Sequence, residues 1–197
     1  MRDLIRRTAV AAGATALVLG ASAGAAAASA AAPTSHLYWA NQNAGTIVEA
    51  NLNGTSAHVI ASGQNTPHGV AVDASHLYWA NAGAGTIVEA GLDGTGAHVI
   101  ASSQAQPLGV AVDASHLYWA NWNAGTIVEA GLDGTGAHVI ASGLFPAGVA
   151  VDASHLYWGN QGTVTIPGTI VEANLDGTGA KVIASRQNGP TGVAVGP

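Results

Sequence analysis

The sequence has 197 residues, of which 48% are hydrophobic and only 8% are charged. Eleven Asp and Glu residues outnumber five Lys and Arg residues, which gives a formal net charge of −6. Phosphate binding relies on clustered Lys and Arg, so this balance argues against nucleic acid as a partner. The chain has no cysteine, so no disulfide can stabilise it.

The first thirty residues have the pattern of a secretory signal peptide. Arg2, Arg6 and Arg7 precede an Ala-, Leu- and Val-rich stretch that runs to about residue 28, and small residues follow at 28–30. A basic start, an apolar centre and a small-residue exit are typical of exported chains. We expect cleavage after about Ala30, a short linker at 31–34 and secretion by the general or the twin-arginine route. A permanent membrane anchor is the alternative.

Cleavage would change the charge balance of the remaining chain. It removes Asp3 and three arginines, which leaves ten acidic residues against Lys181 and Arg186. No second apolar run of spanning length follows, so we expect the extracellular protein to have no membrane contact after cleavage.

From residue 35 to residue 197 the chain repeats one unit four times, at about 35–74, 75–114, 115–153 and 154–197. His-Leu-Tyr-Trp marks each copy, and its tyrosines are spaced by 40, 40 and 39 residues at Tyr38, Tyr78, Tyr118 and Tyr157. A fixed period of this length, built from strand-like runs and turn signals, predicts a β-propeller whose blades are four-stranded sheets.

Each unit divides into four predicted strands, taken here in chain order. In one unit they cover 69–72, 77–79, 86–92 and 97–101, separated by Asp-, Asn- and Gly-rich segments. Asp93-Gly94, between two apolar runs, suits a type I′ turn. No segment has helical periodicity, so the fold class is all-β.

The two ends of the repeat region are complementary. The first copy begins at Leu37 without a preceding Gly-Val-Ala-Val, and the last one finishes on Gly192–Val195 without a following Tyr-Trp. Pairing these ends would complete one blade and hide two strand edges, so we predict four blades closed by this pairing. The alternative is an open or domain-swapped array. We accordingly expect a monomer, with a dimer as the alternative.

The repeated motifs resemble a known family. Gly-Val-Ala-Val-Asp, Leu-Tyr-Trp-Ala-Asn and Gly-Thr-Ile-Val-Glu-Ala-Asn-Leu-Asp-Gly-Thr are similar to the YWTD repeat of propellers of the low-density-lipoprotein-receptor type, here in a secreted protein of bacterial type. The resemblance covers residues 35–197 and implies a propeller fold and a binding role. The family usually has six blades. Its Thr-Asp is replaced by Ala-Asn or Gly-Asn, so its carboxylate contact between blades would be made by an amide, at Asn41, Asn81, Asn121 and Asn160.

Most repeated residues are interpreted as structural. We expect the Tyr-Trp pairs to pack in the core, and the strand glutamates such as Glu89 to be solvated or hydrogen-bonded. His76 and its equivalents stand near Asp73-type residues, which allows a metal site as an alternative. One His per blade would spread the ligands around a rim, however, so we predict neither a metal nor a cofactor.

The copies differ mainly in the loops that join the second and third strands and in the loops that leave the fourth strand, which should share one face. Binding residues collect on such loops when a rigid scaffold holds them. The predicted binding residues on this face are Gln42, Asn43, His68, Trp122, Asn123, Leu144, Phe145 and Arg186.

These patterns favour a secreted, non-enzymatic module that binds a protein, a peptide or a carbohydrate. Two other classes stay open. One is a metal-dependent propeller enzyme of the lactonase or lyase type, although no motif of catalytic spacing is recognisable. The other is a structural surface protein built from near-identical repeats.

Overall fold

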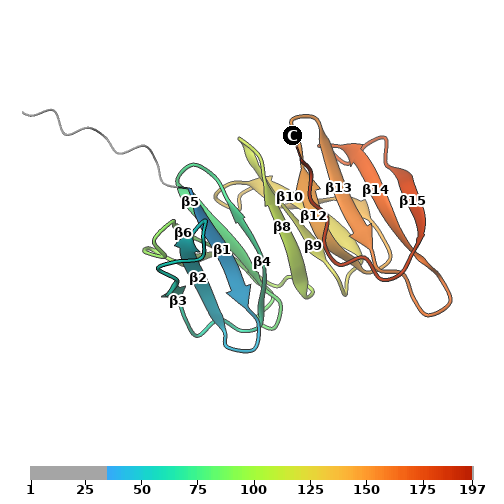
Figure 1. Cartoon of the computed structure of the whole chain (residues 1–197). Helices are drawn as coiled ribbons and strands as arrows, with labels where there is room; N and C mark the ends of the chain where they lie inside the picture. The colour runs from blue at the N-terminus through green and yellow to red at the C-terminus, as the bar shows by residue number, and fades with distance from the viewer. Residues whose placement is uncertain (1–34, 197) are drawn as a thin grey trace, which may run out of the picture. The chain divides into compact units, whose positions relative to one another are not determined.

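The computed structural model describes residues 35–196, and the predicted signal peptide and linker lie outside this range (Figure 1). Regular structure within 35–196 consists of fifteen antiparallel strands in four sheets, with no helix. The all-β prediction and the four-stranded blade are thereby confirmed. No helix in this part of the chain is long and apolar enough to cross a membrane.

Three sheets have four strands each, hydrogen-bonded in chain order, and the first sheet has three. The first sheet contains β1 (His36–Asn41), β2 (Thr46–Asn51) and β3 (His58–Ala61). The second contains β4 (Pro67–Val72), β5 (His76–Asn81), β6 (Thr86–Gly91) and β7 (His98–Ala101). The third contains β8 (Pro107–Val112), β9 (His116–Asn121), β10 (Thr126–Gly131) and β11 (His138–Ser142). The fourth contains β12 (Pro146–Val151), β13 (His155–Asn160), β14 (Gly168–Asn174) and β15 (Lys181–Gln187).

The Asp-Gly turn between β6 and β7 differs from the predicted type I′ geometry. That geometry needs a positive φ at both central residues. Gly94 has a φ of 80°, but Asp93 is not among the residues with positive φ. Gly94 N–H instead donates to Gly91 C=O at 2.8 Å, and the Asp93 carboxylate accepts from the Thr95 amide at 3.0 Å. The Asp93 side chain therefore stabilises a loop that is longer than the two-residue type I′ turn.

The core lies between neighbouring sheets. Trp79 of the second sheet is fully buried in one cluster with Ile47 of the first. Trp119 of the third sheet packs in the same way with Tyr78 and Ile87 of the second, and an equivalent cluster joins the third sheet to the fourth. In each case the Trp faces the preceding sheet, and the Tyr faces the following one. The structural interpretation of the Tyr-Trp motif is confirmed at Trp79, Trp119 and Trp158, whereas Trp39 of the first copy is 36% exposed.

Glycines at the first strand of each complete sheet let neighbouring backbones approach closely. A Cβ added at Gly109 of β8 would meet the backbone of Ala147 and Val149 in β12, with the Val149 nitrogen at 2.8 Å. Gly69 in β4 approaches β8 in the same manner. Only a residue without a Cβ fits at this spacing.

The predicted ring closure is not confirmed. Within the described residues β1 pairs only with β2, and Gly192–Val195 forms no strand. This segment instead lies against Gly148 of β12, where an added Cβ would meet Thr191 and Val193 at 2.8 Å. It repeats the packing of β8 on Gly69, so it extends the array beside the fourth sheet, away from β1 (Figure 1).

Candidate functional site

The variable loops lie side by side, as predicted from their positions in the repeat. The amide of Ala82 donates to Thr66 C=O at 3.0 Å, and the amide of Trp122 donates to Gln106 C=O at 3.1 Å. We call their common surface the variable-loop face. It comprises residues 41–46, 62–68, 81–86, 102–108, 121–126, 143–147, 160–168 and 186–191.

Two aromatic residues stack at one place on this face. The ring centroids of Trp122 and Phe145 are 4.7 Å apart, with an interplanar angle of 32°. The Trp122 indole N–H donates to the side-chain oxygen Oε1 of Gln161 at 2.9 Å. The backbone N–H of Gln161 donates to Phe145 C=O at 3.1 Å. Both rings are half-buried. The loops of the third and fourth sheets therefore hold a fixed aromatic pair with part of its surface open to solvent.

Two hollows adjoin this pair through Gln161, which lines both. The larger one, of about 570 Å³, is also lined by Thr163, Val164, Arg186 and Asn188. Val164 and Pro167 are its apolar side chains, and the exposed Arg186 provides a positive charge.

The smaller hollow, of about 190 Å³, lies at the start of the first strands of the sheets. His68, Leu108, Ala147 and Thr191 occupy equivalent positions there, each next to a repeated glycine. Burial lowers the pKa of His68, which favours a neutral imidazole at neutral pH. This hollow can receive an uncharged group, with His68 as a hydrogen-bonding partner.

The remaining predicted residues are not all gathered at this place. Gln42 and Asn43 are exposed and line a separate hollow of about 530 Å³, together with residues 63–66. Asn123 and Leu144 are exposed on loops beside the aromatic pair. Leu144 C=O accepts from the Gly162 amide at 3.3 Å, which ties its loop to the wall of the larger hollow.

Sequence reasoning missed the glutamines that connect successive sheets. Gln64 Oε1 accepts from the buried Trp79 indole and from the Asn81 amide, both at 2.9 Å. Gln104 makes the same contacts with Trp119 and Asn121. The contact between blades that the family resemblance implies for Asn81 is thus a hydrogen bond to Gln64, in the linker between β3 and β4. The signal was available, because Gln stands two residues after Ile-Ala-Ser in three of the four copies, at Gln64, Gln104 and Gln187.

The junction of the third and fourth sheets lacks this glutamine. Gly143 takes its backbone position, since its amide donates to Gly125 C=O at 2.9 Å, as the Gln64 amide donates to Gly45 C=O. Among residues 35–196, the buried Trp158 indole N–H has no hydrogen-bond partner, unlike the Trp79 and Trp119 indoles. The linker that provides Leu144 and Phe145 is thus also the one that leaves this indole donor unsatisfied.

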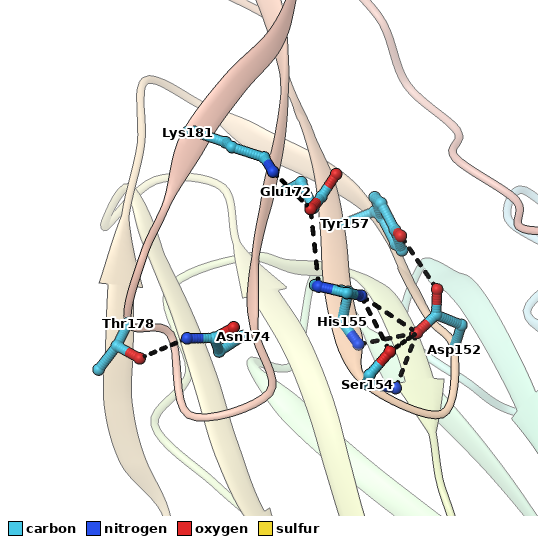
Figure 2. Close-up of polar contacts among 8 residues, drawn as sticks. All are labelled: Asp152, Ser154, His155, Tyr157, Glu172, Asn174, Thr178 and Lys181. Atoms are coloured by element: carbon cyan, nitrogen blue, oxygen red, sulfur yellow. Dashed lines mark hydrogen bonds and ion pairs between the residues drawn. The ribbon is translucent and has the colours of Figure 1, made fainter.

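The opposite face carries a repeated polar arrangement, drawn for the fourth sheet in Figure 2. Asp152 Oδ1 accepts from the amides of Ser154 and His155 at 2.8 Å, and Oδ2 accepts from the Tyr157 hydroxyl at 3.0 Å. These hydrogen bonds, the backbone ones first, lower the pKa of Asp152 to about 2. The same contacts recur at Asp73 and Asp113. The aspartate therefore stabilises the turn before the Tyr-Trp strand.

The strand glutamates lie beside Lys and His side chains on that face. Glu172 contacts Lys181 Nζ at 3.0 Å and His155 Nε2 at 3.7 Å (Figure 2). In the second sheet, Glu89 lies 3.5 Å from His76 Nε2. Residues 35–196 contain no group of three or more His, Cys, Asp and Glu arranged to hold a metal ion.

The chain is similar to known proteins in structure. No protein family and no curated protein matches the sequence. A chain in the nidogen/laminin complex matches with a TM-score of 0.73 and 25% identity, over 80% of this chain and 64% of that one. The present chain thus spans less than two thirds of it.

Two enzyme structures also match. A gluconolactonase from Xanthomonas campestris has a TM-score of 0.66 and 18% identity, over 83% of this chain and 63% of that one. A virginiamycin B lyase from Staphylococcus aureus has a TM-score of 0.66 and 12% identity, over 83% and 57%. Together with the four-stranded sheets, the matches support a YWTD-like β-propeller fold.

Proposed function

We propose that the chain is a secreted, non-enzymatic β-propeller that binds a protein, a peptide or a carbohydrate on its variable-loop face. The observation that carries this proposal is the stacked Trp122–Phe145 pair, which Gln161 holds next to two hollows. Half-buried aromatic rings among polar groups are typical of the anchor points of recognition surfaces.

The chemistry around the pair supports a partner with polar or acidic groups. Arg186 and Lys181 are the two basic residues beyond residue 34, and only Arg186 lines a hollow on this face. Lys181 is paired with Glu172 on the opposite face. A carboxylate or a hydroxyl-rich group on the partner can therefore reach a cation beside the aromatic surface.

The test is a binding screen against glycan and peptide arrays, followed by affinity measurements on the strongest hit. We expect Trp122→Ala and Phe145→Ala to weaken binding about thirtyfold or more, as truncation of a hot-spot aromatic does. Arg186→Gln should weaken it as well. Thermal unfolding must be measured beside affinity, because Trp122 also holds Gln161.

Two substitutions on the opposite face serve as controls. Lys181→Gln makes the same change of charge as Arg186→Gln, and His76→Ala removes a repeated ring. Both should leave affinity unchanged. Equal affinity for the Trp122 and Phe145 variants and the parent, or a larger loss from His76→Ala, would place the binding site elsewhere.

The likeness to the gluconolactonase and the lyase is a likeness of fold alone, and one fold supports many activities. A divalent-metal series in a thermal-shift assay separates the two classes. A rise in Tm with metal, together with lactone or lyase turnover, would replace the binding proposal by the enzyme alternative.

A further inference from the structure

We infer that a second copy of this 197-residue chain completes the first sheet, by pairing its Gly192–Val195 segment with β1. The first sheet has three strands where the other three have four. The missing one is the strand that β4, β8 and β12 provide elsewhere. All three of those strands contain Gly-Val-Ala-Val, and so does the segment 192–195.

Two apolar side chains of β1 are exposed where their equivalents in the described sheets are covered. Leu37 is 43% exposed and Trp39 is 36% exposed, whereas Leu77 and Trp79 of β5 are fully buried. Free strand edges with apolar side chains are templates for pairing with another chain.

The segment that fits this edge is already held in the right place on the other side of the array. Thr191 and Val193 pack against Gly148 as β12 packs against Gly109. The segment thus occupies the position of the first strand of a following sheet, and Val195 is 43% exposed. The pairing of β4 with β5 sets the expected register, in which Val193 faces Trp39 and Ala194 faces Tyr38.

The side-chain surfaces at the two ends are also complementary. At the internal junctions, Tyr and Ile of one sheet cover Leu and Trp of the next; one example is Tyr78 and Ile87 with Leu117 and Trp119. At the ends, Tyr157 and Ile170 are only half-buried, and Leu37 and Trp39 are exposed. Joining the ends of two copies would rebuild the internal junction. Such a contact is head-to-tail, and it produces a closed ring or a longer chain of copies.

A second copy fits this edge better than the segment before residue 35 does. Residues 1–34 contain no Gly-Val-Ala-Val sequence, and their only β-branched residues besides Thr are Ile5, Val10 and Val18. The segment 192–195 matches the covering strand of the other three sheets in all four residues.

The test uses the absence of cysteine from the chain. Tyr38→Cys and Ala194→Cys are made as separate variants, refolded together and oxidised. Residues directly opposite on antiparallel strands have Cβ atoms about 4.5–5.5 Å apart, close to what a disulfide needs. We expect a covalent dimer from the mixture and none from either variant alone. A double variant that cross-links only within one chain, with no dimer from the mixture, would overturn the inference in favour of intrachain closure.

A second measurement is the mass of the full chain in solution by light scattering. We expect at least twice the mass of one chain, falling to one for Leu37→Asp, because a buried unpaired charge opposes pairing. The matched control Leu52→Asp, at a residue 61% exposed on a turn, should stay assembled. A parent chain with the mass of one copy, or an assembly that Leu37→Asp leaves unchanged, would overturn the inference.

Discussion

Gln64 and Gln104 each satisfy two buried donors of the following sheet, so a single linker side chain stabilises the junction between two blades. We expect Gln64→Ala to lower the free energy of unfolding by about 2 kcal/mol, because a buried donor left without a partner costs about 1–3 kcal/mol. Denaturant unfolding monitored by Trp fluorescence measures this loss. Gln42→Ala, at an exposed loop residue, should cost almost nothing. Equal stability of the two variants would contradict this role for Gln64.

Asp152 makes the stability of its turn dependent on pH. Its pKa of about 2 in the folded protein lies below the ordinary value of 3.8. A carboxylate with a lowered folded pKa stabilises the protein fully above its unfolded pKa, and this contribution is lost as the pH falls through the folded pKa. The Tm difference between the parent and Asp152→Asn should therefore be largest above about pH 5 and shrink between about pH 4 and pH 2.

Tm measured by circular dichroism across this pH range provides the test. Asn188→Ala, a neutral change at an exposed residue, should give a Tm difference that does not vary with pH. A Tm difference between the parent and Asp152→Asn that stays constant down to about pH 2 would contradict the prediction. It would show that these hydrogen bonds do not lower the pKa of Asp152.

At the same scale, the sequence predicted which residue types matter better than it predicted their partners. The apolar and aromatic residues in varying loops identified Trp122 and Phe145, which the structure brings into contact. Gln161 escaped notice because its role depends on the indole of another repeat, 39 residues away. A linear pattern carries no information on such a pairing unless the repeat is first folded into sheets.

At the scale of elements, the spacing between sheets depends on glycines in their first strands. Gly109→Ala would place a methyl group against the backbone of Ala147 and Val149, which cannot move aside as a side chain can. Overpacking of this kind costs about 1–3 kcal/mol. We expect a lower denaturant midpoint for Gly109→Ala. Gly196→Ala, where an added Cβ meets nothing within 4 Å, should match the parent. If Gly109→Ala and Gly196→Ala have the same denaturant midpoint, the third and fourth sheets can move apart to accept a methyl group without loss of stability.

Strand positions were predictable because each run is short, β-branched and bounded by turn residues. The run predicted at 86–92 is β6, Thr86–Gly91, and the one predicted at 97–101 is β7, His98–Ala101. The turn between them was predicted with the wrong geometry, since Asp93 bonds the Thr95 amide. Ring closure was not predictable from complementary ends, because it depends on the rotation between sheets, which packing at Gly69, Gly109 and Gly148 determines.

At the scale of the whole molecule, export remains a prediction from the first thirty residues. We expect the protein secreted by its native host to begin near residue 31, because signal peptidase cuts after small residues such as Ala28-Ser29-Ala30. Intact-mass spectrometry of the culture medium tests this. The cell-associated fraction serves as the control and should contain any uncleaved precursor. A secreted product that still carries Met1 would contradict the prediction.

The unpartnered indole of Trp158 has a consequence for how the molecule fluctuates. In a linear array each repeat is stabilised by its neighbours, so opening begins at the weakest junction. Gln64 and Gln104 each provide an acceptor oxygen to the Trp of the following sheet, at the junctions of the first with the second sheet and of the second with the third. Gly143 provides no such side chain at the junction of the third with the fourth sheet. The amides of the fourth sheet should therefore exchange with deuterium sooner than those of the second and third. Trp122 and Gln161 stand on opposite sides of this junction, so an opening that separates the third and fourth sheets would also break their hydrogen bond and part the recognition surface.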